Sequence, residues 1–361
     1  MNNIFKILSV FVFCIAIAAC SKSDDTSTTP LRDYATQYAA DLDSIDDYID
    51  THYITVDPTT FDVSFAEIPT GGTQQSIRTQ TQYPLKDTTV TEDGIDYKVY
   101  FIKFREGTEK RPTQVDSVYV SYRGVRLTDD QFDIAQNPIW LSLQGVITGW
   151  THIFPNFHTG TYTSTPGPNP TTFNDFGAGI MFLPSGLAYY ENASGSIPAY
   201  SPIIFSFKLY QLRYRDNDLD GILSKDERKL DPNISPLIRW KENPAANLYK
   251  IVNNQMVIDV PFLDTDGDGT ANLYDIDDDG DTFLTKIERK YTITSGTPSN
   301  PIVHTYYYPF SGAAVDDPTT EVNEMHGIPR KFTASPPPLS DFTDATRLRR
   351  HLDPTCYPPY Q

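Results

Sequence analysis

The sequence predicts an α+β protein in which strands surround one short amphipathic helix, with a further helix before them and a loop-rich extension after them. Three observations support this class. Apolar residues alternate with a period of two in several segments between Tyr97 and Tyr214. They recur at helical spacing over Val146 to Phe157. Two strongly acidic loop sequences follow Tyr214.

Length and charge narrow the possible functions. A chain of 361 residues has room for two or three domains of ~150 residues, and its 39% hydrophobic residues suffice for a buried core. Lys and Arg number 29 against 47 Asp and Glu, which gives a formal net charge of -18. Such a charge repels phosphate groups, so we expect no nucleic-acid partner.

Residues 1–19 have the layout of a signal peptide. Lys6 precedes an apolar run that is too short to span a bilayer comfortably. The run ends in Ile17 to Cys20, which resembles a bacterial lipobox, the signal whose Cys is acylated before cleavage. The resemblance implies an outer-membrane lipoprotein with a membrane anchor on Cys20. An ordinary signal peptide with an incidental Cys is the alternative.

Residues 20–30 form a polar tether in this interpretation. Ser21 to Asp25 resembles the acidic export signal of some Bacteroidetes lipoproteins, so the anchored protein would face either the periplasm or the cell surface. Of the other cysteines, Cys14 leaves with the signal peptide and Cys356 has no partner. We therefore expect no disulfide framework.

Residues 31–96 are predicted to be an N-terminal helix followed by a linker. Apolar residues from Leu31 to Tyr53 fall at helical spacing, with acidic residues on the opposite face. An acidic polar face disfavours membrane binding, so the helix should pack on the next domain. Residues 57–96 are rich in Thr, Gly and Asp without clear periodicity, which predicts loops.

Residues 97–214 contain the predicted strands, over 97–104, 117–122 and 203–209, and the short helix over 146–157. Five sequence blocks in this segment carry a family resemblance: Val118 to Gly124, Phe132-Asp133, Gly145 to Trp150, Leu183 to Tyr189, and Ile197-Pro198 with Ile203 to Phe207. In this order they resemble the FKBP-type peptidyl-prolyl cis-trans isomerases. The resemblance covers about a third of the chain and implies a curved antiparallel sheet wrapped over the helix.

The implied reaction explains why such a site is aromatic. Rotation about an Xaa-Pro bond must cross a barrier of ~18–20 kcal/mol, because twisting removes amide resonance. No nucleophile or proton shuttle is needed. A site lowers the barrier by excluding water, gripping the proline ring and binding the twisted amide better than the planar one. Catalysis therefore requires no cofactor.

By this resemblance a set of apolar, Tyr and Asp residues forms the catalytic site. Trp150 would be the floor of the pocket, and its walls would be Tyr122, Phe132, Val146, Ile147 and Phe205. The Ile197 backbone N–H and the Tyr189 hydroxyl would hydrogen-bond the ligand, with Asp133 at the rim. The apolar members have an alternative role as ordinary core residues.

Two features depart from the family pattern, and a third leaves one site residue unassigned. Tyr190 stands where the family usually has Gly, and the stretch 159–176 is longer than the usual connection. Either change could reshape the mouth of the pocket. The segment Asn137 to Trp140 leaves open which residue supplies the remaining pocket aromatic.

Residues 215–290 are predicted to bind calcium. The segment Asp216 to Glu227 fits the twelve-residue EF-hand loop, with acidic residues at positions 1, 3, 5 and 12 and Gly at position 6. The expected ligands are Asp216, Asp218, Asp220, Ile222 through its carbonyl, and Glu227. A solvated acidic turn is the alternative.

A second acidic cluster spans residues 264–281 and resembles the calcium repeats of thrombospondin type 3. It contains eight Asp and no base, so mutual repulsion would expand it unless a cation were present. The expected ligands are Asp264, Asp266, Asp268, Asp275, Asp277, Asp279, Asp281 and Glu288, although Thr282 replaces Gly in the last loop. Ca²⁺ suits this density of oxygen ligands, and we expect a structural role for it.

Residues 291–361 form a Pro-rich C-terminal region with one expected strand over Val303 to Phe310. The whole sequence predicts a lipid-anchored peptidyl-prolyl isomerase that assists the folding of exported proteins and binds proline-containing exported polypeptides. One alternative is a catalytically weak FKBP-type binding or assembly module on the cell envelope. Another is a protein whose calcium loops and tail bind a surface partner.

Overall fold

The computed structural model describes residues 31–164, 171–227, 249–252, 255–258, 263–307, 331–332, 340–341 and 350–354. The chain divides into two compact units, 1–33 and 34–361, and the description below concerns the second. The predicted signal peptide, Cys20, the tether and Cys356 lie outside the described residues, as does most of the Pro-rich region. Across the described parts, no helix is both long and apolar enough to cross a membrane.

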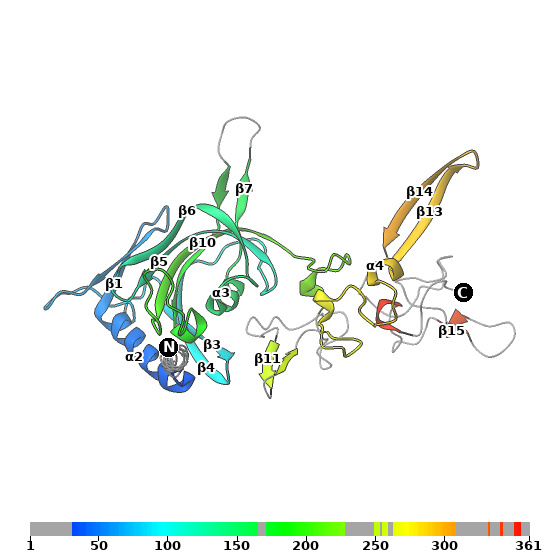
Figure 1. The fold of residues 1–361 in the computed structure, drawn as a ribbon. Coiled ribbons are helices and arrows are strands. Elements are labelled where there is room, and N and C mark those ends of the chain that lie inside the picture. The colour runs from blue at the N-terminus through cyan, green and yellow to red at the C-terminus, as the bar shows by residue number, and fades with distance from the viewer. Residues whose placement is uncertain are drawn as a thin grey trace, which may run out of the picture. The chain divides into compact units, whose positions relative to one another are not determined.

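A six-stranded antiparallel sheet is the largest element of the fold (Figure 1). Its order is β3-β4-β9-β10-β5-β6. The strands are β3 (Leu85–Glu92), β4 (Ile95–Arg105), β5 (Ser117–Arg126), β6 (Gln131–Ser142), β9 (Gly177–Leu183) and β10 (Ile203–Arg213). All seven residues of the central strand β9 are buried. This mixed architecture of antiparallel sheets and few helices agrees with the predicted class.

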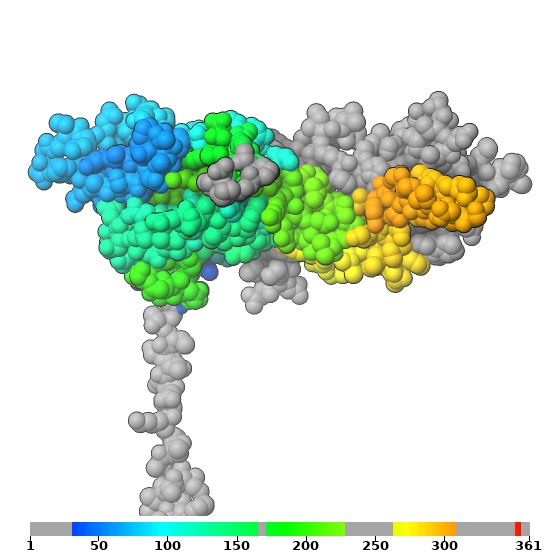
Figure 2. Space-filling view, turned by 90° about the horizontal axis from the view of Figure 1, so that it is seen from above, coloured from blue at the N-terminus to red at the C-terminus, as the bar shows by residue number. Residues whose placement is uncertain are grey.

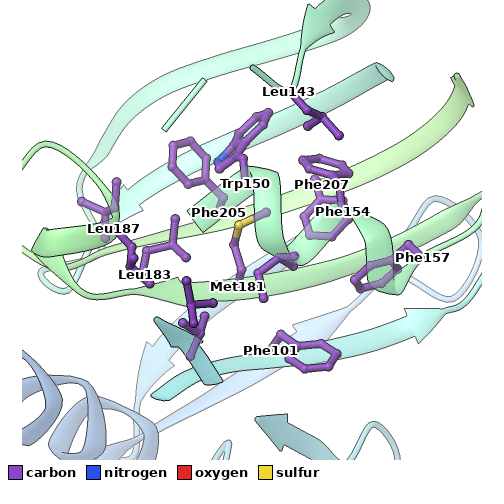
Figure 3. Packing of buried hydrophobic residues seen from close by; sticks show 14 of the residues in the cluster. Phe101, Leu143, Trp150, Phe154, Phe157, Met181, Leu183, Leu187, Phe205 and Phe207 are labelled. Atoms are coloured by element: carbon purple, nitrogen blue, oxygen red, sulfur yellow. The ribbon is translucent and has the colours of Figure 1, made fainter. Parts of the chain in front are cut away.

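The short predicted helix lies against one face of this sheet. It consists of α3 (Thr148–Ile153) and a 3₁₀ turn (Phe154–Asn156). The ring centroids of Phe154 and Phe207 are 4.6 Å apart across the interface with β10 (Figure 3). Gly149 permits the close approach of helix to sheet, since a Cβ there would collide with the Leu183 side chain. The helix and this face of the sheet enclose a first core.

The N-terminal helix covers the opposite face of the sheet. It is α2 (Tyr34–Thr51), and an antiparallel pair, β1 (His52–Val56) and β2 (Val63–Glu67), follows it. Ile45 and Ile49 of α2 belong to a second core with Phe182 and Ile204, whose neighbours along β9 and β10 belong to the first core. The sheet is therefore covered by a helix on each face.

The predicted boundary between linker and domain at residue 96 is wrong, and so is the prediction that residues 57–96 are loops. That segment contains β2 and β3, and β3 pairs with β4 along its whole length. β3 is an edge strand with three Thr residues, and Val90 is its one buried residue, so its sequence shows no clear apolar alternation. The N-terminal region is thus part of the body that holds the sheet.

Buried hydrogen bonds fasten α2 to the turn that follows β9. Asp41 Oδ2 accepts hydrogen bonds from the backbone N–H and the hydroxyl of Ser185, at 2.7 and 2.6 Å. The Gln37 amide donates to Asp41 Oδ1 at 2.7 Å. All three residues are buried, so removal of the carboxylate would strand several donors.

Short elements make up the described part of the C-terminal extension. The strand pairs are β11 (Tyr249–Val252) with β12 (Gln255–Ile258), β13 (Lys290–Thr297) with β14 (Asn300–Tyr307), and β15 (Lys331–Phe332) with β16 (Ser340–Asp341). They are joined by α4 (Thr285–Glu288) and by 3₁₀ turns at Ser224–Asp226, Asn272–Tyr274 and Arg350–Leu352. The strand expected over 303–310 is β14, and its partner β13 was not expected. Every residue of β14 is exposed, and the hairpin is orange in Figure 2.

Candidate functional site

Four aromatic side chains that the sequence assigns to a pocket lie together beside the first core. They come from four elements: Tyr122 from β5, Phe132 from β6, Trp150 from α3 and Phe205 from β10. The Phe205 ring centroid lies 4.9 Å from that of Trp150, 5.3 Å from that of Phe132 and 5.9 Å from that of Tyr122. The three interplanar angles lie between 70° and 90°, in the edge-to-face range that aromatic pairs favour. We call these four residues the aromatic cage.

A glycine in β5 makes room for the cage. Strand register places Gly124 opposite Phe205 on one side and opposite Asp133, next to Phe132, on the other. A Cβ on Gly124 would lie 2.5 Å from Phe132 Cζ and 2.8 Å from Phe205 Cε1. The two rings can therefore meet over β5 because residue 124 has no side chain.

The other predicted apolar residues border the same cluster. Three of the predicted residues belong to the buried first core, namely Trp150, Ile197 and Phe205. Five are partly exposed and pack against that core, namely Tyr122, Phe132, Val146, Ile147 and Tyr189. Partly exposed apolar side chains over a buried apolar floor are compatible with a small-ligand site. The structure thus places all the predicted apolar site residues in or against one core.

Asp133 is exposed at the edge of the cage and holds Tyr122 in place. Its Oδ2 accepts a hydrogen bond from the Tyr122 hydroxyl at 2.8 Å, and its Oδ1 accepts one from the Ile134 backbone N–H at 2.8 Å. Burial and this hydrogen bond to Asp133 raise the pKa of Tyr122 to about 12. The Tyr122 hydroxyl therefore stays protonated at neutral pH, and its ring is oriented toward Trp150.

The two expected hydrogen-bond donors differ in their availability. Burial, and after it the charge of Asp133, raises the pKa of Tyr189, so its hydroxyl is a neutral donor. The Ile197 backbone N–H already donates to the Ser194 carbonyl at 2.9 Å, and the Ile197 carbonyl accepts from the Ser194 N–H at 3.0 Å. A ligand that accepts a hydrogen bond from the Ile197 N–H would have to replace this internal bond. The sequence did not predict the internal bond.

Tyr190, the departure from the family's Gly, points toward α2. Its backbone has a φ of 47°, in the left-handed region that favours glycine. Its ring stacks on Tyr34 of α2 at a centroid distance of 4.3 Å and meets Tyr200 edge-on at 5.1 Å. The sequence suggested that Tyr190 could reshape the mouth of the pocket. In the structure its ring contacts the N-terminal helix instead.

The long connection 159–176 contains a small hairpin, β7 (Thr161–Thr163) with β8 (Thr172–Asn174). Phe173 of β8 packs on Tyr210 at 4.9 Å and on Tyr119 at 6.0 Å. Tyr119 precedes Gly124 by five residues on β5, which is roughly 17 Å along a strand. The described part of this connection therefore contacts the sheet away from the cage.

Trp140 is not the missing pocket aromatic. It lies opposite Tyr119 in the register of β5 and β6, with ring centroids 5.1 Å apart. The Arg213 guanidinium lies 4.0 Å from its ring centroid. Trp140 therefore belongs to the same end of the sheet as Tyr119.

The acidic loops gather carboxylates as their sequences predict. Three groups of Asp side chains have ligand atoms within 4.8 Å of one another: Asp216 with Asp218 and Asp220, Asp264 with Asp266 and Asp268, and Asp277 with Asp279 and Asp281. Gly221, at position 6 of the first loop, has a φ of 97°, and Thr282 has a φ of 81° at the equivalent place in the last loop. Asp275 and Glu288 lie in none of the carboxylate groups found among the described residues.

The first loop fits a hard divalent cation. Both carboxylate oxygens of Glu227, Asp218 Oδ2 and Asp220 Oδ2 are buried and have no hydrogen-bond partner among the described residues. Burial, and after it the neighbouring carboxylates, raises the pKa of Glu227 to about 11. Ca²⁺ binds oxygen ligands of this kind and would compensate their charge. Within the loop, the Ile222 N–H donates a hydrogen bond to Asp220 Oδ1 at 2.5 Å.

One buried carboxylate was missed by sequence reasoning. Asp278 lies with Asp220 and Glu227, its ligand atom within 4.8 Å of theirs. Counting positions within one loop cannot find it, because it reaches the first loop from the second acidic cluster. Its burial beside other acidic residues raises its pKa to about 9.

Comparison with known proteins gives a different result for each half of the chain. The family described as BamM C-terminal matches residues 217–322, the part that holds the acidic loops. The FKBP-type peptidyl-prolyl cis-trans isomerase FkpA of Aeromonas hydrophila is 31% identical over 134 residues. That match covers 36% of this chain and 42% of the relative, so the chain spans less than half of the relative's length.

Two solved structures are also similar. A peptidyl-prolyl cis-trans isomerase from Pseudomonas syringae pv. tomato str. DC3000 is 25% identical, with 34% of this chain and 80% of that chain covered and a TM-score of 0.27. FkpA from Escherichia coli is 18% identical, with 59% and 72% covered and a TM-score of 0.30. Over about a third of its length, this chain is therefore similar to FKBP-type peptidyl-prolyl isomerases.

Proposed function

We propose that the body formed by residues 34–214 is an FKBP-type peptidyl-prolyl cis-trans isomerase. The observation that carries the proposal is the aromatic cage with its partly exposed rim, built from the residues that the sequence assigns to a proline site. Sequence similarity to FkpA of Aeromonas hydrophila supports it. The substrates would be proline-containing segments of exported polypeptides.

In this proposal each residue of the site acts by shape and polarity. Phe132, Phe205 and Tyr122 would hold the proline ring, and the buried Trp150 would close the floor against water. An amide twisted about its C–N bond loses resonance, so an apolar surround that fits the twisted form lowers the barrier. The Tyr189 hydroxyl would donate a hydrogen bond to a substrate carbonyl. Proton transfer and a bound cofactor are not required.

The proposed setting is the outer membrane. Anchoring would come from lipid on Cys20, with the tether 20–30 leading to α2. The match of residues 217–322 to the BamM C-terminal family is in keeping with an outer-membrane association. Calcium in the loops of residues 215–290 would stabilise the extension and take no part in catalysis.

The second candidate is a binding or assembly module with weak catalysis. Two observations favour it. The Ile197 N–H is already engaged by Ser194. A hollow of about 400 Å³ lies beside β5 and β10, lined by Arg123, Lys208 and Tyr122 but not by Trp150 or Phe205. A peptide held there would contact one residue of the aromatic cage and miss its floor.

Isomerisation kinetics separate the two candidates. The chain from residue 31 should accelerate the proline-limited refolding phase of a test protein, which otherwise takes tens to hundreds of seconds. Phe132→Ala should lower kcat/KM roughly tenfold or more, because it removes a wall of the cage. Tyr189→Phe should lower it less, through loss of one hydrogen bond.

The matched control is Trp140→Ala, which truncates another partly exposed aromatic residue of β6 that lies outside the cage. It should leave kcat/KM unchanged while removing a similar apolar surface. A folded wild-type protein that does not change the refolding rate would overturn the isomerase proposal in favour of the binding module. Equal losses in Phe132→Ala and Trp140→Ala would remove the cage from the mechanism.

A further inference from the structure

Three buried carboxylates from two separate segments converge beside the first acidic loop. Asp220 and Glu227 belong to that loop, and Asp278 comes from the second acidic cluster. One carboxylate oxygen of each lies within 4.8 Å of the other two. The three residues are only 2%, 3% and 2% exposed, so water cannot screen their mutual repulsion.

Each of the three carboxylates has at least one buried oxygen that is unpaired among the described residues. Asp220 Oδ2, Asp278 Oδ1 and both oxygens of Glu227 are buried without a hydrogen-bond partner among the residues that the structure describes. The other oxygen of Asp220 is taken by the Ile222 N–H at 2.5 Å. Buried acceptors with no donor are costly unless a cation supplies the missing interaction.

Nearby positive charge is too small to balance these groups. Arg289 is buried and lies close enough to Asp220, Asp278, Asp216 and Glu227 to interact with their charges. Lys286 is exposed and donates to the Leu219 carbonyl at 2.8 Å. With both bases counted, two positive charges stand against the carboxylates of Asp216, Asp218, Asp220, Glu227 and Asp278.

The backbone holds the two segments in contact at this point. The Asp278 N–H donates to Thr285 Oγ1 at 3.0 Å, and this bond holds the backbone of Asp278 in place. The Leu263 N–H donates to the Glu227 carbonyl at 3.1 Å. The bond from Leu263 to Glu227 and the bond from Lys286 to Leu219 join the first loop to the segment that carries Asp278.

We propose that Asp278 completes a calcium site with Asp220 and Glu227, so that one Ca²⁺ ion bridges the first loop and the second acidic cluster. The ligand set consists of oxygens only, and it includes a Glu able to bind through both oxygens, which suits Ca²⁺ better than softer metals. The ion links residues 220 and 278 across the intervening chain. This inference extends the proposed calcium loops and is independent of the isomerase proposal.

Calcium titration of the full-length chain in mild detergent tests this assignment by isothermal calorimetry. Asp278→Asn and Glu227→Gln should each weaken the same binding event at least tenfold, and the double variant should lose little more than either single variant, because the residues share one ion. Asp226→Asn is the matched control, since Asp226 lies in the same loop but pairs with Lys225 at 2.7 Å. It should leave the isotherm unchanged.

Thermal unfolding adds a second measurement, because the difference in unfolding temperature between Asp278→Asn and wild type should change sign when calcium is present. In chelator, Asp278→Asn should unfold at a higher temperature than wild type, because it removes one of three crowded, buried carboxylates that have unpaired oxygens. In millimolar calcium the order should reverse, because wild type gains a ligand for the ion.

Three results would overturn the proposal. The first is a wild type that binds no calcium, which would also remove the calcium loops. The second is a wild-type isotherm for Asp278→Asn together with loss of a site in Glu227→Gln. The third is an Asp278→Asn variant that unfolds at a lower temperature than wild type in both chelator and calcium, as expected for a purely structural role. None of these outcomes bears on isomerase activity, which is measured separately.

Discussion

Replacing Gly124 by alanine tests whether cage geometry governs activity. The new Cβ would lie 2.5 Å from Phe132 Cζ and 2.8 Å from Phe205 Cε1. Carbon atoms pack at ~3.5–4.0 Å, so each ring must retreat by about 1 Å. Overpacking of this kind costs about 1–3 kcal/mol in the free energy of unfolding. If both rings are walls of the site, kcat/KM should fall by roughly tenfold to a hundredfold.

Urea unfolding gives the stability and proline-limited refolding gives kcat/KM. Gly145→Ala is the matched control, because a Cβ there meets nothing closer than Ser142 O at 3.7 Å. Adding Phe132→Ala to Gly124→Ala removes the nearest clash, so it should restore part of the stability without restoring activity. Wild-type stability in Gly124→Ala would refute the packing argument. A loss of stability with unchanged kcat/KM would show that the geometry of the cage does not govern catalysis.

Two further predictions concern the N-terminal part of the chain. Cys20→Ala should abolish fractionation with membranes, since stable anchoring requires acyl chains; membrane-bound, normally processed Cys20→Ala protein would contradict the lipobox interpretation. Asp41→Ala should lower the free energy of unfolding by roughly 2–5 kcal/mol, because it strands the buried donors of Ser185 and Gln37, whereas the exposed Asp43→Ala should change it by less than about 0.5 kcal/mol. Equal stability of the two variants in urea would contradict the role of Asp41.

The aromatic cage was predictable because each of its residues lies in a short, recognisable sequence block. Tyr122, Phe132, Trp150 and Phe205 each lie in a short block whose order along the chain resembles one family. Strand alternation places the three strand residues on the face that α3 covers with Trp150. β3 was not predictable in the same way. Its sequence is mostly polar because one side of an edge strand faces water, and β4 supplies the pairing.

The details that the sequence could not provide depend on tertiary neighbours. Nothing near Ile197 in the sequence indicates that its N–H is bonded to Ser194, since a turn conformation determines this. Asp278 occupies a position inside its own loop that carries no ligand role there, and only the approach of the first loop makes it one of three facing carboxylates. The position of the Tyr190 ring also depends on a tertiary neighbour, because the ring stacks on Tyr34 of α2.

The bonds between α2 and the turn after β9 also form a path for mechanical force. Tension applied at the N-terminal end of α2 would reach Ser185 through the Asp41 carboxylate and Tyr190 through the stack with Tyr34. Both contact points lie within four residues of Tyr189, whose hydroxyl faces the cage rim in the proposed site. A pull at the start of α2 would therefore load the segment that carries Tyr189.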